Sequence, residues 1–330
     1  MGKVICFGEV LLRYSPLAGE ESFVQGSMPV YVGGAELNVA CALAKWGLPV
    51  LYCTAMPDNF LSQSIKRYIN YHKIDSTPIH NSGSRIGLYN LEQGTDVKSA
   101  GVVFDRSGSS FSELQPGMID WQKVLQGVTW FHFTAIAASL TSNTTAVCLE
   151  ALKVAQSMNI TISIDLNHRA QLWQYGKKPT EIMPELVKYC NIIMGNLWAV
   201  ESLLGIASPI KDSTGKTNEE LKMAGIKSMQ EIQKQYPKVT TMAYTFRLEN
   251  NYWAMVQQGK ELGISKLHEV ANVVDKVGSG DCFMAGLIYG LYNQHALQQA
   301  TNFAAAAAVG KLYEKGDATQ QTVEEINKRI

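Results

Sequence analysis

The 330-residue sequence has no excess of charge of either sign, because 29 Lys and Arg residues balance 29 Asp and Glu residues. Such a balance gives no electrostatic attraction toward nucleic acid or an anionic membrane surface. The sequence also has no apolar run long enough to cross a bilayer and no basic leader followed by a long apolar stretch. We therefore expect a cytoplasmic protein that binds small molecules, with neither nucleic acid nor a membrane as a partner.

Cysteine pairs with the CxxC spacing are absent as well. The six cysteines are scattered, most of them within apolar runs, at Cys6, Cys41, Cys53, Cys148, Cys190 and Cys282. This spacing predicts buried free thiols and argues against a disulfide framework or a zinc site. Two well-known phosphate-binding loops are missing too, since the sequence contains neither GxxxxGKS/T nor a GxGxxG that follows a strand.

What the sequence does contain is a regular alternation of short apolar strands and amphipathic helices. We expect strands over residues 51–55, 129–133, 160–165, 192–194 and 240–245, and helices over 36–46, 144–158, 181–189, 219–235, 281–292 and 299–313. Thr322 and Glu325 form a capping-box pattern that predicts one more helix. Repeated strand–helix–strand units predict an α/β protein of three layers, α/β/α, with a mostly parallel central sheet. Ligands of such folds bind beyond the carboxyl ends of the strands.

Two regions interrupt this alternation. Residues 11–33 contain strand-like pieces and no helical pattern, and residues 85–110 read as strands with turns at Gly94 and Gly108. We expect both to form a small β-sheet lid outside the main sheet. The predicted domains are therefore an α/β core over 1–10, 34–84 and 111–330, and a discontinuous β-lid over 11–33 and 85–110.

The most informative motif is DKVGSGDCF at residues 275–283, which an apolar helical pattern follows. Gly278, Ser279 and Gly280 therefore stand at a helix start, where unpaired backbone N–H groups and the helix dipole attract anions. Asp281 could take a proton from a hydroxyl while these amides hold a transferring phosphoryl group. The alternative is that the aspartate only caps the helix, which is the commoner role for such a motif taken alone.

A second glycine-rich helix start, VGGAELN, covers residues 32–38. Gly33 and Gly34 allow the backbone to approach a ligand, and Asn38 supplies a donor and an acceptor one turn later. A simple hinge before a helix is an equally good interpretation of this motif.

A third candidate, DLNHRAQLW at residues 165–173, follows an expected strand. Arg169 could bind a carboxylate or a phosphate through two parallel hydrogen bonds. The alternative is a local ion pair between Asp165 and Arg169.

Other residues have simpler interpretations. Arg106 lies in the expected lid, where it could contact a ligand. The alternative is a solvated surface charge, which is the usual role of a single arginine. Trp130 and His132 lie in an apolar strand, which favours a role in the core. The alanine run 304–308 predicts a closely packed helix face, although a flat adenine ring could also lie against it.

Taken together, these stretches resemble the ribokinase-like sugar kinases, also called the phosphofructokinase-B family, over nearly the full length. Stretches 8–16, 31–38, 87–89 and 165–173 are most similar to the 2-keto-3-deoxygluconate kinases of that family. The resemblance implies a ribokinase-like fold, ATP and Mg²⁺ as cofactors, and carbohydrate metabolism as the setting. It leaves open whether a monovalent cation is required and whether the chain forms a homo-oligomer.

The resemblance also implies roles for individual residues. Asp281 would be the catalytic base, with Gly278, Ser279 and Gly280 as the anion hole. The substrate would be bound by Gly33, Gly34, Asn38, Tyr89, Phe104, Arg106 and Arg169, and the nucleotide by Asn196, Asp275, Gly278 and Gly280.

Two positions depart from the family pattern. Phe104 replaces a tyrosine that is usual in the subgroup, which removes one hydrogen bond to the substrate, worth about 1 kcal/mol. Ala199 replaces the glutamate of an Asn-x-x-Glu motif that orders the magnesium ion and its waters, and Glu201 lies two residues further on. The metal ligands therefore stay unassigned at the sequence level.

The leading hypothesis is an ATP-dependent kinase for the primary hydroxyl of a sugar acid, with 2-keto-3-deoxygluconate as the expected substrate and its 6-phosphate as product. Two arginines from distant segments suit a substrate carboxylate, because a neutral sugar would leave their buried charge uncompensated. The alternatives are a fructokinase or other neutral-ketose kinase, and a non-catalytic sensor of sugars or nucleotides.

Overall fold

The computed structural model describes residues 2–17, 21–93 and 101–330. Its central sheet has nine strands in the described part of the chain. In spatial order these are β14 (Glu261–Ile264), β13 (Asn251–Gln258), β12 (Thr241–Arg247), β11 (Ile192–Gly195), β10 (Thr161–Asp165), β9 (Val128–Thr134), β1 (Lys3–Phe7) and β4 (Val50–Cys53), with β15 (His268–Glu269) paired to β13. The strands from β12 to β4 are parallel, and β13 pairs antiparallel with each of its neighbours. The mostly parallel sheet is thus confirmed.

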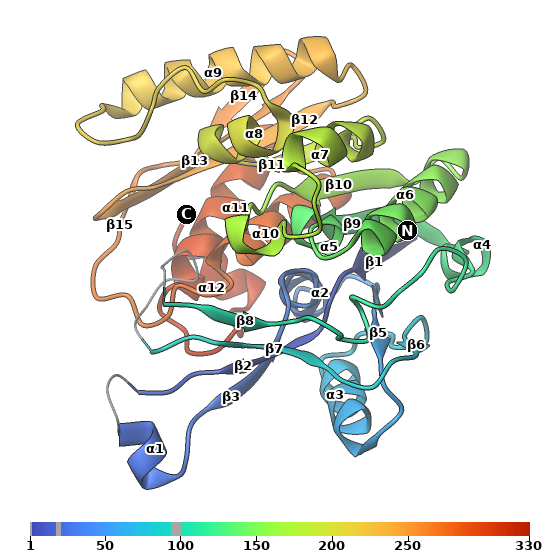
Figure 1. Ribbon diagram of the computed structural model, residues 1–330. Helices are drawn as coiled ribbons and strands as arrows, with labels where there is room; N and C mark the ends of the chain where they lie inside the picture. Colours follow the sequence, from blue (N-terminus) through green and yellow to red (C-terminus); the bar gives the residue numbers. More distant parts are fainter. Residues whose placement is uncertain (1, 18–20, 94–100) are drawn as a thin grey trace.

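Alternate residues of the central strands face two different helical layers, as the pleat of a strand requires. In β1, Val4 and Cys6 join one core cluster, while Ile5 and Phe7 join the other. The first cluster is covered by α2 (Ala35–Lys45), α3 (Phe60–Tyr71), α10 (Ser279–Tyr292), α11 (Leu297–Lys311) and α12 (Val323–Asn327). The second is covered by α4 (Trp121–Val124), α5 (Ala135–Ala138), α6 (Ser142–Ser157), α7 (Pro179–Val187), α8 (Leu197–Leu204) and α9 (Asn218–Gln235). Figure 1 shows this three-layer arrangement.

Helices α10 and α11 pack closely because small residues line their contact. The alanine run 304–308 is fully buried. A side-chain carbon at Gly286 would lie only 2.6 Å from the Cα atom of Ala304, so this glycine permits the helices to approach. The predicted close-packing role of the run is confirmed, and its burial leaves no surface against which an adenine ring could lie.

A separate four-stranded sheet is built from two distant segments (Figure 1). Its order is β3 (Val30–Gly33), β2 (Leu11–Tyr14), β7 (Gly87–Asn90) and β8 (Val103–Asp105). The predicted small sheet is therefore present, and Gly108 forms the expected turn with a left-handed φ of 67°. The turn predicted at Gly94 lies outside the described residues. A further short pair joins β5 (Ala55–Met56) to β6 (His80–Asn81).

One expectation for this region is wrong. A short helix, α1 (Glu21–Gln25), lies between β2 and β3, where no helix was expected. Its five residues are too few to show a helical period in the sequence. The helix ends at Gly26, whose φ of 66° is the left-handed conformation that commonly terminates helices.

Several smaller expectations are confirmed. All six cysteines are buried, and so are Trp130 and His132. Thr322 and Glu325 form the predicted capping box at the start of α12. In the described part of the chain, no helix has the length and apolarity needed to cross a membrane.

Candidate active site

The site is built around the start of helix α10, where the backbone conformation requires glycine at position 278. Gly278 caps the helix with a left-handed φ of 80°, and any side chain there would collide with the backbone oxygen of Asp317. The first amide to bond back is that of Cys282, which donates to the Gly278 carbonyl at 2.8 Å. The N–H groups of Gly278, Ser279, Gly280 and Asp281 therefore have no partner within the helix, as at any helix start. These four amides form the amide cradle.

The side chains of the cradle leave room for a ligand. The Ser279 hydroxyl donates to the Ala308 carbonyl at 3.0 Å and points into the core. A carbon added at Gly280 would meet no atom within 4 Å, so the space in front of this residue is open. Because the φ of Gly280 is not in the left-handed range, the backbone conformation does not itself require glycine here. The open space in front of the cradle is therefore the feature that this glycine preserves.

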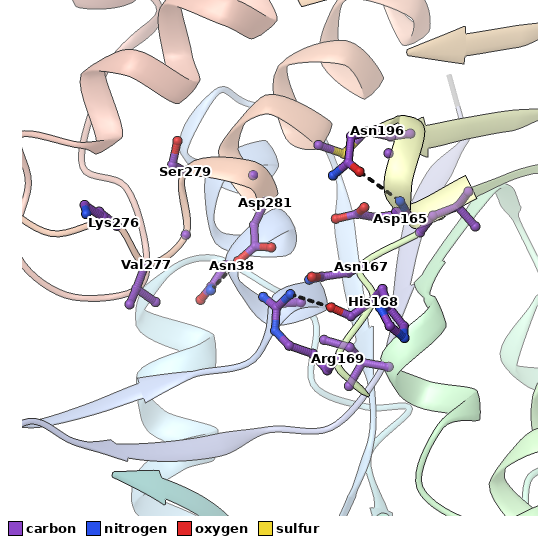
Figure 2. A pocket seen from close by; sticks show the side chains of 18 of the residues that line it. Asn38, Asp165, Asn167, His168, Arg169, Asn196, Lys276, Val277, Ser279 and Asp281 are labelled. Atoms are coloured by element: carbon purple, nitrogen blue, oxygen red, sulfur yellow. Dashed lines mark hydrogen bonds between the residues drawn. The ribbon is translucent and has the colours of Figure 1, made fainter. Parts of the chain in front are cut away.

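Asp281 lies beside the cradle at the wall of a cavity of about 710 Å³. Only 8% of the residue is exposed, and its Oδ2 atom accepts a hydrogen bond of 2.7 Å from the Asn38 side-chain amide. Burial raises the pKa of Asp281 to about 6, although the Asn38 hydrogen bond and the charge of Arg169 lower it. Figure 2 shows Asn38, Arg169 and Asp281 around one space. A carboxylate with this pKa can accept a proton near neutral pH.

The glycine motif before α2 supplies the neighbouring wall. Gly34 has a φ of 131°, and a side chain there would collide with the Glu9 backbone oxygen, so the turn requires glycine. Gly34 and Asn38 both line the cavity. Gly33 is not among the lining residues; it packs against the carboxylate of Asp317 instead.

The small sheet contributes Tyr89, Phe104 and Arg106 to the cavity wall. Arg106 is buried and forms an ion pair with Glu9, with its Nε atom 2.6 Å from Oε2. Sequence analysis did not identify Glu9, which lies in the loop after β1. Because Glu9 already compensates the charge of Arg106, a substrate carboxylate is not needed for that purpose.

Arg169 reaches the cavity from the loop after β10, as expected for a ligand site at a strand end. Its Nη1 atom donates to the His168 carbonyl at 3.0 Å. The side chains of Asp165, Asn167 and His168 line the same region of the cavity (Figure 2).

Asn196 lines the far part of the cavity and also caps a helix. Its Oδ1 atom accepts the Ala199 amide at 2.9 Å at the start of α8. Ala199 lines the cavity, whereas Glu201 is exposed and is not a lining residue. Glu201 therefore does not take the place of the missing glutamate.

The oxygen donors of the cavity fit a magnesium ion held mainly by a nucleotide. No group of three His, Cys, Asp or Glu side chains forms a metal site among the described residues. Mg²⁺ usually keeps several waters and binds through one or two carboxylates together with substrate phosphates. Asp165 and Asp281 are the carboxylates that could contribute, and the Asn196 amide lies nearby (Figure 2).

Asp317 is a cavity residue that sequence analysis missed. It is 3% exposed, and its Oδ2 atom accepts the Tyr89 hydroxyl at 3.0 Å. Its only local signal is the preceding Gly316, which has a left-handed φ of 88°. Asp275, which was expected to bind the nucleotide, is not a lining residue; it forms an ion pair with Arg13.

The sequence profile of the pfkB family carbohydrate kinases matches residues 1–323. The chain belongs to this family. Its fold is similar to the crystal structure of 2-dehydro-3-deoxygluconokinase from Thermotoga maritima, with a TM-score of 0.89, 34% identity and coverage of 99% of both chains.

Two further relatives can be aligned with almost the whole of this chain. The 2-dehydro-3-deoxygalactonokinase of Haloferax volcanii is 23% identical over 99% of this chain and 96% of its own. An E. coli protein described as a putative ribokinase II, crystallised with ATP and Mg²⁺, shares the fold with a TM-score of 0.77 at 17% identity, over 100% of this chain and 99% of its own. Family membership makes this protein a carbohydrate kinase, and kinases of this family use ATP with Mg²⁺.

Proposed function

We propose that this kinase transfers the γ-phosphoryl group of ATP to the primary hydroxyl of a six-carbon sugar acid, with 2-keto-3-deoxygluconate as the favoured substrate. The observation that carries the proposal is the position of Asp281. Its buried carboxylate lies beside the amide cradle, and the guanidinium of Arg169 lies close enough to lower its pKa. A base, an anion site and a cation thus face one cavity.

Asp281 would act as the general base. Asn38 holds its Oδ2 atom and fixes the direction of the carboxylate. With a pKa of about 6, the group is mostly ionised at neutral pH and can take the hydroxyl proton as the alcohol attacks.

The amides of Gly278, Ser279, Gly280 and Asp281 would stabilise the charge that gathers on the transferring phosphoryl group. Bound magnesium supplies positive charge to the phosphate oxygens of the nucleotide. Tyr89 and Phe104 belong to the small sheet and line the cavity, and this sheet would act as the lid. A closed lid excludes water and so suppresses hydrolysis of ATP.

Arg169 is the residue that most favours an acidic substrate. A guanidinium can bind a carboxylate through two parallel hydrogen bonds. The relatives described above include kinases named for deoxygluconate and deoxygalactonate substrates, which supports the same substrate class.

A second candidate is a neutral ketose such as fructose. The observation that favours it is the ion pair between Arg106 and Glu9, because a charge that is already compensated does not require an acidic substrate.

Turnover should be compared for 2-keto-3-deoxygluconate, its galactonate-derived epimer and fructose. We expect the wild type to prefer a sugar acid and Arg169→Leu to lose about 10²-fold or more in kcat/KM for it, the effect of removing a charge-assisted contact of 2–3 kcal/mol or more. Arg85→Leu is a matched control, because Arg85 pairs with Asp105 outside the cavity. Preference for fructose with no effect of Arg169→Leu would contradict the proposal.

A further inference from the structure

Arg13 is a buried arginine that neither the reaction nor the substrate argument uses. It lies on β2 of the small sheet and is only 2% exposed. Its guanidinium meets Asp275 as a fork, with Nη2 2.6 Å from Oδ2 and Nη1 3.3 Å from Oδ1. The Tyr31 ring of the neighbouring strand lies over the same group, with Cζ 4.5 Å from the ring centroid. Asp275 and Tyr31 thus hold the guanidinium from two sides.

The third nitrogen of the Arg13 guanidinium, Nε, forms an ion pair with a second carboxylate. Its Nε atom is 2.8 Å from Oδ1 of Asp317, whose other oxygen accepts the Tyr89 hydroxyl. Arg13 and Tyr89 are direct neighbours across β2 and β7. The small sheet therefore contacts Asp317 through two adjacent side chains.

Asp275 and Asp317 flank the amide cradle on two sides. Asp275 Oδ1 accepts the amide of Val277, one residue before Gly278. The backbone oxygen of Asp317 lies against Gly278 so closely that no side chain fits between them. A shift of either carboxylate would therefore move the first residue of the cradle.

The charges around the cradle also depend on Arg13. Asp275 and Asp317 are two acidic groups close to the place where nucleotide phosphates bind. Burial raises the pKa of Asp317, and the charge of Arg13 opposes this rise and so favours the ionised form. The buried Lys311 is a further cation of this region, but burial lowers its pKa and so disfavours its charged form. Arg13 keeps its charge at any physiological pH and contacts both carboxylates.

We propose that Arg13 is a positioning residue for phosphoryl transfer, which joins the small sheet to both flanks of the amide cradle and offsets part of the negative charge behind it. This proposal rests on the proposed transfer of phosphate from ATP at this cradle. Its consequence is that Arg13, although it does not line the cavity, determines how well the site holds a terminal phosphate.

The direct test is the binding of nucleotides without sugar, measured by calorimetry for Arg13→Met and the wild type. We expect the Kd of a non-hydrolysable ATP analogue to rise about tenfold or more, equivalent to about 1.4 kcal/mol, and that of AMP to change less than about threefold. General damage to the site would weaken both nucleotides equally. Equal changes, or an unchanged Kd for the analogue, would overturn the proposal.

Two further variants separate charge from folding. Arg13→Met with Asp275→Asn removes the uncompensated charge, and we expect it to regain part of the lost affinity for the ATP analogue; no recovery would contradict the role of charge.

Arg85→Met breaks an exposed ion pair beside the same sheet and should leave both affinities unchanged. If Arg13→Met does not fold, Arg13→Lys serves instead, because lysine cannot reproduce the fork. Wild-type failure to phosphorylate any sugar would refute the proposed function and leave the nucleotide result to decide the role of Arg13.

Discussion

At the scale of single residues, Asp281 owes its reactivity to burial. The carboxylate is removed from water, which raises its pKa to about 6, and the Asn38 amide and Arg169 offset only part of this effect. Asp317 raises the pKa further, and Lys311 opposes it. The groups around Asp281 thus place its titration just below neutral pH, where a base is both ionised and able to accept a proton.

The pH dependence of activity should follow this titration. A base works only when deprotonated, so kcat/KM should fall as the pH decreases through about 6, with a limiting slope of one proton. The measurement is kcat/KM from pH 5 to 8, under conditions where the enzyme stays folded.

Glu36 provides the control for this profile. It is buried on α2, accepts the Thr134 hydroxyl at 2.6 Å, and has a pKa of about 7 because of burial. Glu36→Gln keeps an acceptor and removes the titration. The acidic limb should persist in this variant; its disappearance would assign the limb to Glu36 instead of Asp281.

Gly280→Ala should separate stability from function. Alanine favours a helix over glycine by up to about 1 kcal/mol, and the added methyl group meets no protein atom. The same methyl group enters the space in front of the cradle, so we expect turnover to fall about 10²-fold, as for displacements of about 1 Å. Thermal unfolding and steady-state kinetics provide the two measurements. Normal turnover would exclude this space as the phosphate site.

At the scale of elements, the contact of α10 with α11 fixes the helix that carries the cradle. Gly286→Ala would push a methyl group toward the Ala304 backbone, 2.6 Å away. Overpacking of this kind typically costs 1–3 kcal/mol. We expect the free energy of unfolding in urea to fall by about that amount, whereas Gly280→Ala in the same helix should not lower it. A stable Gly286→Ala variant would show that the helices can separate slightly without cost.

The sequence allowed most of the helices and parallel strands to be predicted, because each has a periodic apolar pattern of its own. It did not reveal α3, which buries only Ser62, Ile65 and Ile69, the helices α4, α5 and α8, or the antiparallel strands β13 and β14. The cradle was predictable because its glycines and Asp281 are adjacent in the sequence.

The partners of the site residues could not be predicted in the same way. Glu9 is 97 residues from Arg106, and Arg13 is 262 residues from Asp275. No local pattern joins such pairs, since only the folded sheet brings them together. Arg106 shows the consequence, because its charge alone predicts an acidic substrate, whereas its ion pair with Glu9 compensates that charge.

At the scale of the whole molecule, the cavity joins segments from across the chain. Asn38 lies on α2 between β1 and β4, Arg169 follows β10, and Asp281 lies in the first turn of α10 near the end of the chain. The small sheet closes one side with residues from its own two segments. Nucleotide phosphates would be bound by backbone amides, whereas the proton would be taken by the Asp281 side chain. We therefore predict that the two tasks can be separated by mutation of side chains.

The most direct measurement is the turnover of Asp281→Asn with the preferred sugar, together with the Kd of an ATP analogue. Asparagine keeps the size of the side chain and removes the base, so we expect kcat to fall about 10²- to 10⁴-fold. The Kd of the analogue should stay within about threefold of the wild type, since the amide cradle is unchanged. Turnover near the wild-type value would contradict the central claim that Asp281 deprotonates the sugar.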